Sequence, residues 1–252
     1  MLRLSVVSYL NTAPFISGIK KAQLEQQGII ELSLDYPSVC AQKLISGQVD
    51  VGLVPVATLP LLSNYSILGN TCIGAHGKVD SVMLLSDVPL SEIEEIVLDF
   101  QSLTSINLCR LLARDYWNIT PKFIHAKRDF IDTIKKNRAG VVIGDRVFDY
   151  ANRFEYAYDL SETWYNWKNL PFVFACWVSV NPVLASDWNP IESALIQGIS
   201  HPLEAAKEVR SLYPAHYPIE NYLTERISYN LDSLKRQALE TFLTSLSTIS
   251  AD

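Results

Sequence analysis

Polar side chains are concentrated where the first predicted strand gives way to a helix, at Ser8, Tyr9, Asn11 and Thr12. Such a turn exposes backbone N–H groups together with polar side chains, so it can bind a carboxylate or a phosphate. Asn11 or Thr12 can instead serve only as the N-cap of the helix. The pattern leaves the binding role and the capping role both open.

Three hydroxyl side chains, those of Ser102, Thr104 and Ser105, stand at the start of another predicted helix. The free N–H groups there lie at the positive end of the helix dipole, and with the hydroxyls they suit a carboxylate or phosphate. Ser102 or Thr104 is also a normal N-cap. The two roles are compatible.

A loop with two glycines, Gly74 and Gly77, leads into a predicted strand that Ser81 begins. The glycines allow tight backbone geometry or the close approach of a ligand, and the Ser81 hydroxyl can face that ligand. His76 could act as a general base near neutral pH, but no carboxylate partner is evident in the sequence, which favours a plain loop histidine. The sequence contains no dinucleotide-binding or P-loop motif.

Gly144 and Asp145 close a short apolar strand, where Asp145 can either orient a ligand hydroxyl or cap the next helix. Trp164 and Trp167 can line a pocket, although burial in the core is the default role for such residues. No Ser-His-Asp order, zinc-binding motif or carboxylate pair stands out. The residues alone therefore suit a small anion without deciding between binding and catalysis.

The composition is that of a globular protein of 252 residues, with 48% hydrophobic and 19% charged residues. This amount of apolar sequence excludes a disordered chain or a coiled coil. The net charge of −6 argues against nucleic-acid binding through the overall field. No segment reaches membrane-spanning length, and the N-terminus does not resemble a secretory signal. The four cysteines are expected to be buried thiols in a reducing cytoplasm, not a disulfide or metal framework.

Strands alternate with helices along the chain, which indicates an α/β protein. The predicted strands are Leu2–Tyr9, Ile29–Tyr36, Val49–Val56, Val79–Leu85, Ile96–Phe100, Lys122–Ala126, Val141–Asp145 and Leu170–Val180. The predicted helices are Pro14–Gln27, Ser38–Ser46, Leu59–Asn64, Thr104–Trp117 and Asp129–Asn137, with mostly helical sequence beyond Asn189.

The order of the elements predicts two lobes. Two long strands, near Val79–Ser86 and Phe172–Val180, bracket a second βαβ unit and can carry the chain out of the first lobe and back. We therefore expect residues 1–86 and 178–252 to form a discontinuous first lobe, and residues 87–177 to form the second. Folds of this kind bind ligands at strand carboxyl ends and helix N-termini, so we expect a ligand cleft between the lobes.

Several motifs, in this order, resemble the chorismate dehydratase family of the futalosine route to menaquinone. They are Val7–Pro14, Gly47–Pro55, Cys72–Gly74 through Ser81–Val82, Ser102–Ser105, Ile143–Asp145, and Leu170–Ala175 with Trp177. The resemblance implies the fold of type II periplasmic binding proteins. It also implies a cytoplasmic carbon–oxygen lyase that removes water from chorismate, giving 3-[(1-carboxyvinyl)oxy]benzoate, with no metal or redox cofactor.

The resemblance also assigns residue roles. It makes Asn11 and Ser81 the catalytic residues that face the substrate. The substrate-binding residues that we then expect are Tyr9, Thr12, Gly77, Ser102, Thr104, Ser105, Gly144 and Asp145. The proton acceptor can be the substrate's own enolpyruvyl carboxylate, or alternatively His76 or Asp145. His76 departs from the family, in which this position is often acidic.

The basic residues nearest the motifs are Lys78, Arg110 and Arg146, and any of them can meet a substrate carboxylate. Two other functions stay open. One is the sister enzyme that makes 1,4-dihydroxy-6-naphthoate on the same fold, and the other is a non-catalytic binding protein for a small anion. The expected partner is chorismate, without nucleic acid or membrane, and the sequence does not indicate an oligomeric state.

Overall fold

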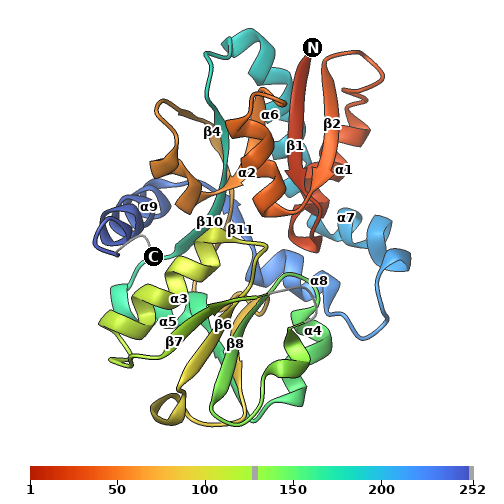
Figure 1. Cartoon of the computed structure of the whole chain (residues 1–252). Helices are drawn as coiled ribbons and strands as arrows, with labels where there is room; N and C mark the ends of the chain where they lie inside the picture. Colours follow the sequence, from red (N-terminus) through yellow and green to blue (C-terminus); the bar gives the residue numbers. More distant parts are fainter. Residues whose placement is uncertain (127–129, 250–252) are drawn as a thin grey trace. The chain divides into compact units, whose positions relative to one another are not determined.

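The computed structural model describes residues 1–126 and 130–249, and the chain divides into two compact units (Figure 1). Unit 1 comprises Met1–Gly74 and Val173–Asp232, and unit 2 comprises Ala75–Phe172 and Ser233–Asp252. This division differs from the expected lobes at both inner boundaries and in the place of the C-terminal helix. That helix groups with unit 2 because Phe242 packs its ring edge-on against Trp164 and Phe172, at 6.1 and 5.1 Å between centroids.

Unit 1 contains a mixed sheet with the strand order β11-β4-β10-β3-β1-β2. Its strands are β1 (Leu2–Val7), β2 (Ile30–Asp35), β3 (Val51–Pro55), β4 (Ser66–Ala75), β10 (Phe172–Ser179) and β11 (Ser228–Asn230). The first strand runs parallel to both β2 and β3, whereas β10 is antiparallel to β3. The carboxyl ends of β1, β2 and β3 therefore share one edge of the sheet, and the polar turn after β1 begins there.

The helices of unit 1 are η1 (Leu10–Thr12), α1 (Ala13–Lys21), α2 (Pro37–Ile45), η2 (Val56–Leu61), α6 (Ala185–Ile199), α7 (Pro202–Val209), η6 (Arg210–Leu212), α8 (Ile219–Asn221) and the π-helical η7 (Tyr222–Arg226). Helices α1 and α2 lie beside the strands of this sheet, and α6 packs on α1 (Figure 1). Glycines let α1 and α6 pack with their backbones in direct contact, since a Cβ on Gly18 would overlap the carbonyl of Ala194 and one on Gly198 would overlap that of Pro14. This packing fixes α1, which follows the polar turn.

Unit 2 contains a second mixed sheet, in the order β7-β6-β8-β5-β9. Its strands are β5 (Val82–Ser86), β6 (Glu95–Leu98), β7 (Lys122–His125), β8 (Arg138–Ile143) and β9 (Tyr156–Asp159). Strand β6 is parallel to β7 and β8, whereas β5 is antiparallel to β8 and β9. The start of β5 and the ends of β6, β8 and β9 consequently meet at one edge of the sheet.

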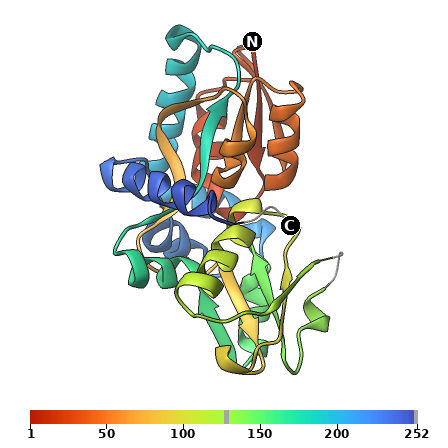
Figure 2. The same ribbon diagram turned by 60° about the vertical axis from the view of Figure 1, so that its left-hand side comes forward.

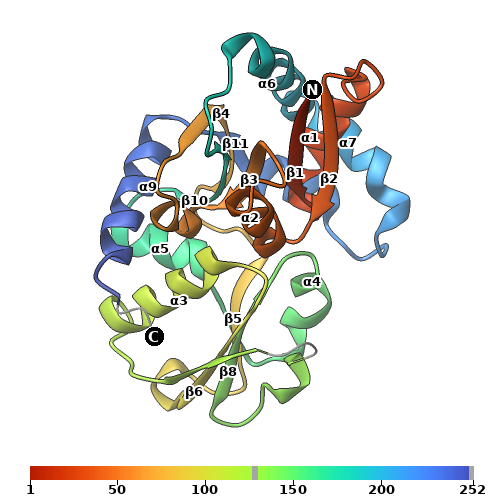
Figure 3. The ribbon, with the colours of Figure 1, turned by 45° about the horizontal axis from the view of Figure 1, so that its top comes forward.

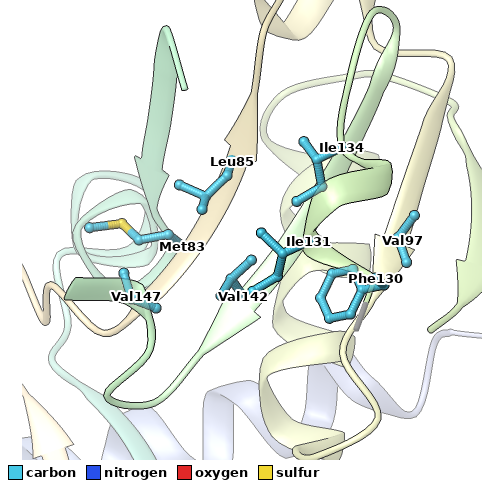
Figure 4. Close-up of a cluster of buried hydrophobic side chains, with 8 residues drawn as sticks. All are labelled: Met83, Leu85, Val97, Phe130, Ile131, Ile134, Val142 and Val147. Carbon is cyan, nitrogen blue, oxygen red and sulfur yellow. The ribbon is translucent and has the colours of Figure 1, made fainter. Parts of the chain in front are cut away.

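The helices of unit 2 are η3 (Leu90–Glu92), α3 (Leu103–Asp115), η4 (Ile131–Thr133), α4 (Val147–Tyr150), η5 (Ala151–Arg153), α5 (Leu160–Lys168) and α9 (Ser233–Leu246). Helix α3 packs against both α5 and α9 (Figure 2, Figure 3). A cluster of buried apolar side chains from β5, β6, β8 and the η4 segment, centred on Val142 and Ile131, forms a core beside the sheet (Figure 4).

Several predicted elements differ from the observed ones. The predicted strand at Val79–Leu85 starts only at Val82, because Asp80 has a left-handed backbone with φ of 61°. It lies wholly in unit 2, and the strands that cross the two inner boundaries are β4 and β10. The first helix ends at Lys21 and not at Gln27, because the backbone of Gln23, with φ of 52°, is left-handed and cannot continue the helix.

The helix predicted at Asp129–Asn137 is wrong, since only the short η4 forms there; Asp129 itself lies outside the described residues. The sequence did not predict β4, β9, β11 or α5.

Within the described residues, no helix is long and apolar enough to cross a membrane. Cys40, Cys72, Cys109 and Cys176 are free and buried, as expected for thiols that fill the core.

Candidate active site

The turn after β1 is held by its own backbone and by Thr12. The Thr12 hydroxyl lies within hydrogen-bond distance of the carbonyls of Val7, at 2.6 Å, and Tyr9, at 2.8 Å. Its only donor hydrogen is therefore used inside the turn. Thr12 occupies the N-cap position of α1, as one of the two predicted candidates, but its side chain makes no capping hydrogen bond, and Asn11 lies within η1.

Asn11 has a side-chain oxygen that the described part of the chain leaves without a hydrogen-bond partner. Its side-chain oxygen is buried and accepts no hydrogen bond from the described part of the chain. Its backbone carbonyl, in contrast, accepts a hydrogen bond from the Tyr229 hydroxyl at 3.0 Å. Buried polar atoms are normally paired, so this oxygen is a candidate for contact with a ligand. Tyr9, beside it, packs its ring against Tyr36 at 6.3 Å between centroids.

In unit 2, the predicted residues gather at the sheet edge where β5 starts and β8 ends. Ser81 precedes β5 directly and is 3% exposed. Its backbone carbonyl accepts a hydrogen bond from the N–H of Gly144 at 2.9 Å, and Gly144 is left-handed, with φ of 74°. The structure thus brings Ser81, Gly144 and the adjoining Asp145 together.

A buried carboxylate ties this cluster to the start of α3. Asp99, which follows β6, accepts hydrogen bonds from the N–H groups of Gln101 and Ile143 at 3.0 and 3.4 Å. It also forms an ion pair with Arg146, whose Nε donates to the Ile143 carbonyl at 3.2 Å. Burial raises the pKa of Asp99, and the guanidinium of Arg146 opposes that rise. Arg146, a candidate for binding a substrate carboxylate, is therefore engaged with Asp99.

The hydroxyls at the start of α3 combine capping with a polar cluster. Ser102 is the N-cap, as predicted, and its Oγ accepts from the Ser105 N–H at 3.4 Å and from the Ser105 hydroxyl at 3.3 Å. Ser102, Thr104 and Ser105 are all buried. Because α3 spans Leu103–Asp115, its dipole and free N–H groups favour an anion next to these hydroxyls.

The remaining predicted residues of unit 2 have distinct settings. Gly77 is left-handed, with φ of 86°, and a Cβ there would meet nothing within 4 Å. His76 is exposed and packs its ring against Tyr165 at 4.9 Å between centroids. Asp145 is not the cap of α4, because Arg146 occupies that position.

Two further predicted residues have other roles. Trp164 is core, as expected, and its Nε1 donates to the Pro171 carbonyl at 3.1 Å. Arg110 lines a cavity of about 350 Å³ with Arg114, Phe123 and Thr248.

Three residues that organise these groups were missed from the sequence, namely Asp99, Asp159 and Tyr229. Asp159 caps α5 and also accepts hydrogen bonds from the N–H groups of Val79 and Asp80, next to Ser81. An aspartate three residues before Glu162 is a recognisable helix-start signal and could have revealed α5. Nothing local could have revealed the contacts that these residues make far along the chain.

Taken separately, each unit presents a polar group built from amide, hydroxyl and backbone N–H groups. Unit 1 contributes the unsatisfied Asn11 side chain. Unit 2 contributes Ser81, the Gly144–Asp145 turn and the start of α3, connected by the hydrogen bonds described above. Such groups can orient carboxylates and donate hydrogen bonds to an oxygen that gains negative charge.

Comparison with known proteins places the chain among biosynthetic relatives. A family model described as menaquinone biosynthesis matches residues 2–248. The chain is 26% identical over 232 residues to a chorismate dehydratase of Thermus thermophilus, and the match covers 83% of this chain and 84% of that protein.

The solved structures that resemble the chain share its fold. A protein of Archaeoglobus fulgidus superposes with a TM-score of 0.75 at 14% identity, covering 98% of this chain and 96% of that one. The alkanesulfonate-binding protein of Xanthomonas axonopodis, bound to MOPS, gives 0.61 at 15% identity, covering 96% and 89%. A Candida albicans protein with the generic periplasmic-binding-protein fold gives 0.63 at 13% identity, covering 100% and 92%. The chain therefore has the two-lobe, α/β periplasmic-binding-protein fold.

Proposed function

The chain belongs to the menaquinone biosynthesis family, and we propose that it is a lyase that dehydrates chorismate to 3-[(1-carboxyvinyl)oxy]benzoate. The observation that carries this proposal is the match to a chorismate dehydratase along most of both chains. The motifs that resemble that enzyme family in the sequence include Asn11, Ser81 and the Ser102–Ser105 segment. We place the reaction in the cytoplasm, because the four cysteines are free thiols and a reducing compartment keeps thiols in this state.

The chemistry requires that chorismate lose a ring proton and the ring hydroxyl, which together make one water. The electron pair of the C–H bond enters the ring as the C–O bond breaks, and the ring becomes aromatic. We assign the ring proton to the substrate's own enolpyruvyl carboxylate, since the predicted contact residues offer mainly amide and hydroxyl groups. Correct positioning of that carboxylate against the proton can supply several kcal/mol of the barrier lowering.

The residues of unit 2 suit the carboxylates of the substrate. The start of α3, with the hydroxyls of Ser102 and Ser105 beside it, favours an anion. Ser81 and the Gly144–Asp145 turn lie next to this group through the Gly144–Ser81 and Asp99–Ile143 hydrogen bonds. In the proposal, Ser81 hydrogen-bonds to the substrate, and Thr104, Gly77 and Asp145 complete the contacts of this unit.

The residues of unit 1 supply a second set of contacts. The half-buried Asn11 has a buried side-chain oxygen without a partner in the described chain, so this oxygen is available to the substrate. In the proposal, the Asn11 Oδ1 accepts from the ring hydroxyl and orients it, and the Asn11 Nδ2 amide donates to that oxygen as it departs, with Tyr9 and Thr12 shaping the turn. Thr12 acts through its hydrogen bonds to Val7 and Tyr9.

The direct test is to incubate the purified protein with chorismate, without added cofactor, and to follow the mixture by mass spectrometry. The expected product is the carboxyvinyloxy-benzoate, which has lost one water. A buffer blank corrects for spontaneous decay of chorismate, and the Asn11→Ala variant shows whether turnover depends on this site. Tight chorismate binding without turnover would point to a binding protein, and neither binding nor turnover would point to a different substrate.

The same assay identifies the proton acceptor. If the substrate carboxylate takes the proton, His76→Ala and Asp145→Asn retain measurable turnover. Loss of turnover with intact chorismate binding in either variant would identify that side chain as the base instead.

A further inference from the structure

Asp159 carries two sets of hydrogen bonds on one buried carboxylate. Its Oδ1 accepts from the N–H groups of Ser161 and Glu162, at 2.9 and 3.1 Å, and so caps α5. Its Oδ2 accepts from the N–H groups of Val79 and Asp80, at 2.9 and 2.7 Å. The residue is 3% exposed. A helix cap needs only the first oxygen, so the second oxygen has a separate role.

The backbone that Oδ2 holds is an unfavourable one. Asp80 has φ of 61°, in the left-handed region that residues other than glycine rarely adopt. Such a conformation persists only where its surroundings impose it. The two hydrogen bonds to Asp159 are placed to impose it, since they involve the N–H of Asp80 itself and that of Val79.

Ser81 follows Asp80 directly, and it is fixed from its other side as well. The Gly144 N–H donates to the Ser81 carbonyl at 2.9 Å, and β5 begins at Val82. The direction in which the Ser81 side chain leaves the backbone therefore depends on the conformation of Asp80. A change of one residue's backbone from left-handed to extended would redirect the Ser81 hydroxyl.

We propose that Asp159 is a positioning residue for Ser81, acting through the left-handed backbone of Asp80. This inference rests on the proposed function, in which Ser81 contacts the substrate. Asp159 itself does not touch the substrate in this account. Its Oδ1 stabilises the fold by capping α5, and its Oδ2 serves catalysis by holding the Val79–Ser81 backbone.

The test uses Asp159→Asn, which preserves the size of the side chain and an oxygen that can cap α5, since asparagine is as good an N-cap as aspartate. The amide then presents N–H groups to Val79 and Asp80, which are donors themselves. We expect kcat for chorismate dehydration to fall roughly tenfold to hundredfold, with KM changed by less than about threefold. Asp159→Ser, which also retains a cap, provides a second variant should the first fold poorly.

A double-mutant cycle separates positioning from a general loss of stability. In the Ser81→Ala background the positioned hydroxyl is absent, so Asp159→Asn should lower kcat by less than about threefold further. Independent, multiplicative effects of the two substitutions would overturn the inference. Asp50→Asn is the matched control, because Asp50 accepts a backbone hydrogen bond from Arg3 at 2.8 Å at the start of β3; its kcat should stay at the wild-type value.

Amide hydrogen exchange tests the inference without relying on turnover. In Asp159→Asn, the N–H groups of Val79 and Asp80 should exchange at least about tenfold faster than in the wild type, with smaller changes at Ser161 and Glu162. Unchanged exchange at Val79 and Asp80 would overturn the inference. If the wild-type protein does not dehydrate chorismate, the proposed function fails, whereas wild-type turnover with a fully active Asp159→Asn contradicts only the role of Asp159.

Discussion

The hydroxyl of Tyr229 donates a hydrogen bond to the backbone carbonyl of Asn11 at 3.0 Å, joining residues 218 positions apart. Tyr229 lies in β11, the edge strand of the unit 1 sheet, and packs its ring edge-on against Phe15 of α1 at 5.4 Å. Burial raises the pKa of Tyr229 well above its usual value, so the phenol stays protonated and remains a donor. The last strand of the sheet thus supports the turn that carries Asn11.

Removing this donor tests whether the support matters for catalysis. Tyr229→Phe keeps the ring and its packing but leaves the Asn11 carbonyl without this partner. We expect the free energy of unfolding to fall by about 1 kcal/mol and kcat to fall a few-fold, measured by urea unfolding and by the chorismate assay. Tyr116→Phe, at an exposed tyrosine, should change neither quantity. Wild-type kcat in Tyr229→Phe would show that the turn keeps its geometry without the hydrogen bond.

Asn11 should matter to activity far more than to stability. Its side chain caps no helix and its oxygen is unpaired in the described chain, so Asn11→Ala should change the free energy of unfolding by less than about 0.5 kcal/mol. Loss of one group that stabilises developing charge typically lowers kcat by about a hundredfold or more. A combination of full activity and reduced stability in Asn11→Ala would contradict the catalytic role.

Ser102 provides the opposite case, because its side chain does cap a helix. Ser102→Ala removes the acceptor of the Ser105 N–H at the start of α3 and should lower the free energy of unfolding by about 1 kcal/mol. If the α3 start also binds a substrate carboxylate, KM for chorismate should rise as well. A stability loss with unchanged KM would reduce Ser102 to a cap.

Local signals explain what was predictable from the sequence. The hydrophobic strand before Ser8, the hydroxyls that open α3 and the ordered motifs were readable, and the family resemblance they supported is confirmed by the match over residues 2–248. The strand β9 was not, because Tyr156–Asp159 contains no β-branched residue and ends in the aspartate that caps α5, whereas the equally short β6 and β7 carry Ile96, Val97 and Ile124. The polar residues Asn70 and Thr71 similarly interrupt β4.

Long-range hydrogen bonds explain what was not predictable. The carboxylate of Asp159 reaches Val79 across 80 positions, and Asp99 reaches Arg146 across 47. Only the sheet order of unit 2 brings these segments to one edge. The sequence could therefore name Ser81 and Gly144 as candidates, but not the residues that hold them in place.

The Asp99–Arg146 ion pair should be worth far more than a surface pair. Asp99 has a side chain that is 0% exposed and Arg146 one that is 26% exposed. Arg146→Met leaves a buried carboxylate without its cation, so the free energy of unfolding should fall by about 3 kcal/mol or more, and kcat/KM should fall about tenfold as the Gly144 turn shifts.

The control for this pair lies on the same sheet. Arg138 and Glu95 pair at 2.6 Å with side chains 40% and 29% exposed, and Arg138→Met should lower the free energy of unfolding by less than about 1 kcal/mol. Removing the charge of both partners, in Asp99→Asn with Arg146→Met, retains a side-chain oxygen as acceptor beside the Gln101 and Ile143 N–H groups and should restore part of the stability lost in the single variant. Equal losses in Arg146→Met and Arg138→Met would show that burial does not strengthen the first pair.

A second polar cluster, beneath α2 in unit 1, should govern the response of the protein to acid. Lys43 donates to both oxygens of Asp35, at 2.6 and 2.8 Å, and the hydroxyls of Ser5 and Ser33 each donate to Oδ2 at 2.8 Å. Burial by itself would raise the pKa of Asp35, but these hydrogen bonds outweigh it and the pKa is lowered.

A lowered pKa means that the folded state binds the proton less readily than the unfolded state does. The stabilisation from Asp35 is therefore complete above about pH 4, the usual range of an aspartate, and is lost as the pH falls through the lower pKa of the folded state. In Lys43→Met only the Ser5 and Ser33 hydroxyls still offset the effect of burial, so the pKa of Asp35 should be higher than in the wild type. The variant should be less stable by about 2 kcal/mol near pH 6.

The difference between the two proteins should begin to shrink as the pH falls through the higher pKa that Asp35 has in Lys43→Met. It should be lost only below the lowered pKa of Asp35 in the folded wild type, where the carboxyl is protonated in both proteins and no longer needs its cation. Urea unfolding at each pH measures this directly. Lys21→Met is the control, since Lys21 pairs with Glu204 and Glu208 on the surface, where solvent screens the interaction. A difference between wild type and Lys43→Met that stays constant across the pH range would mean that Lys43 contributes through packing of its chain and not through the charge of Asp35.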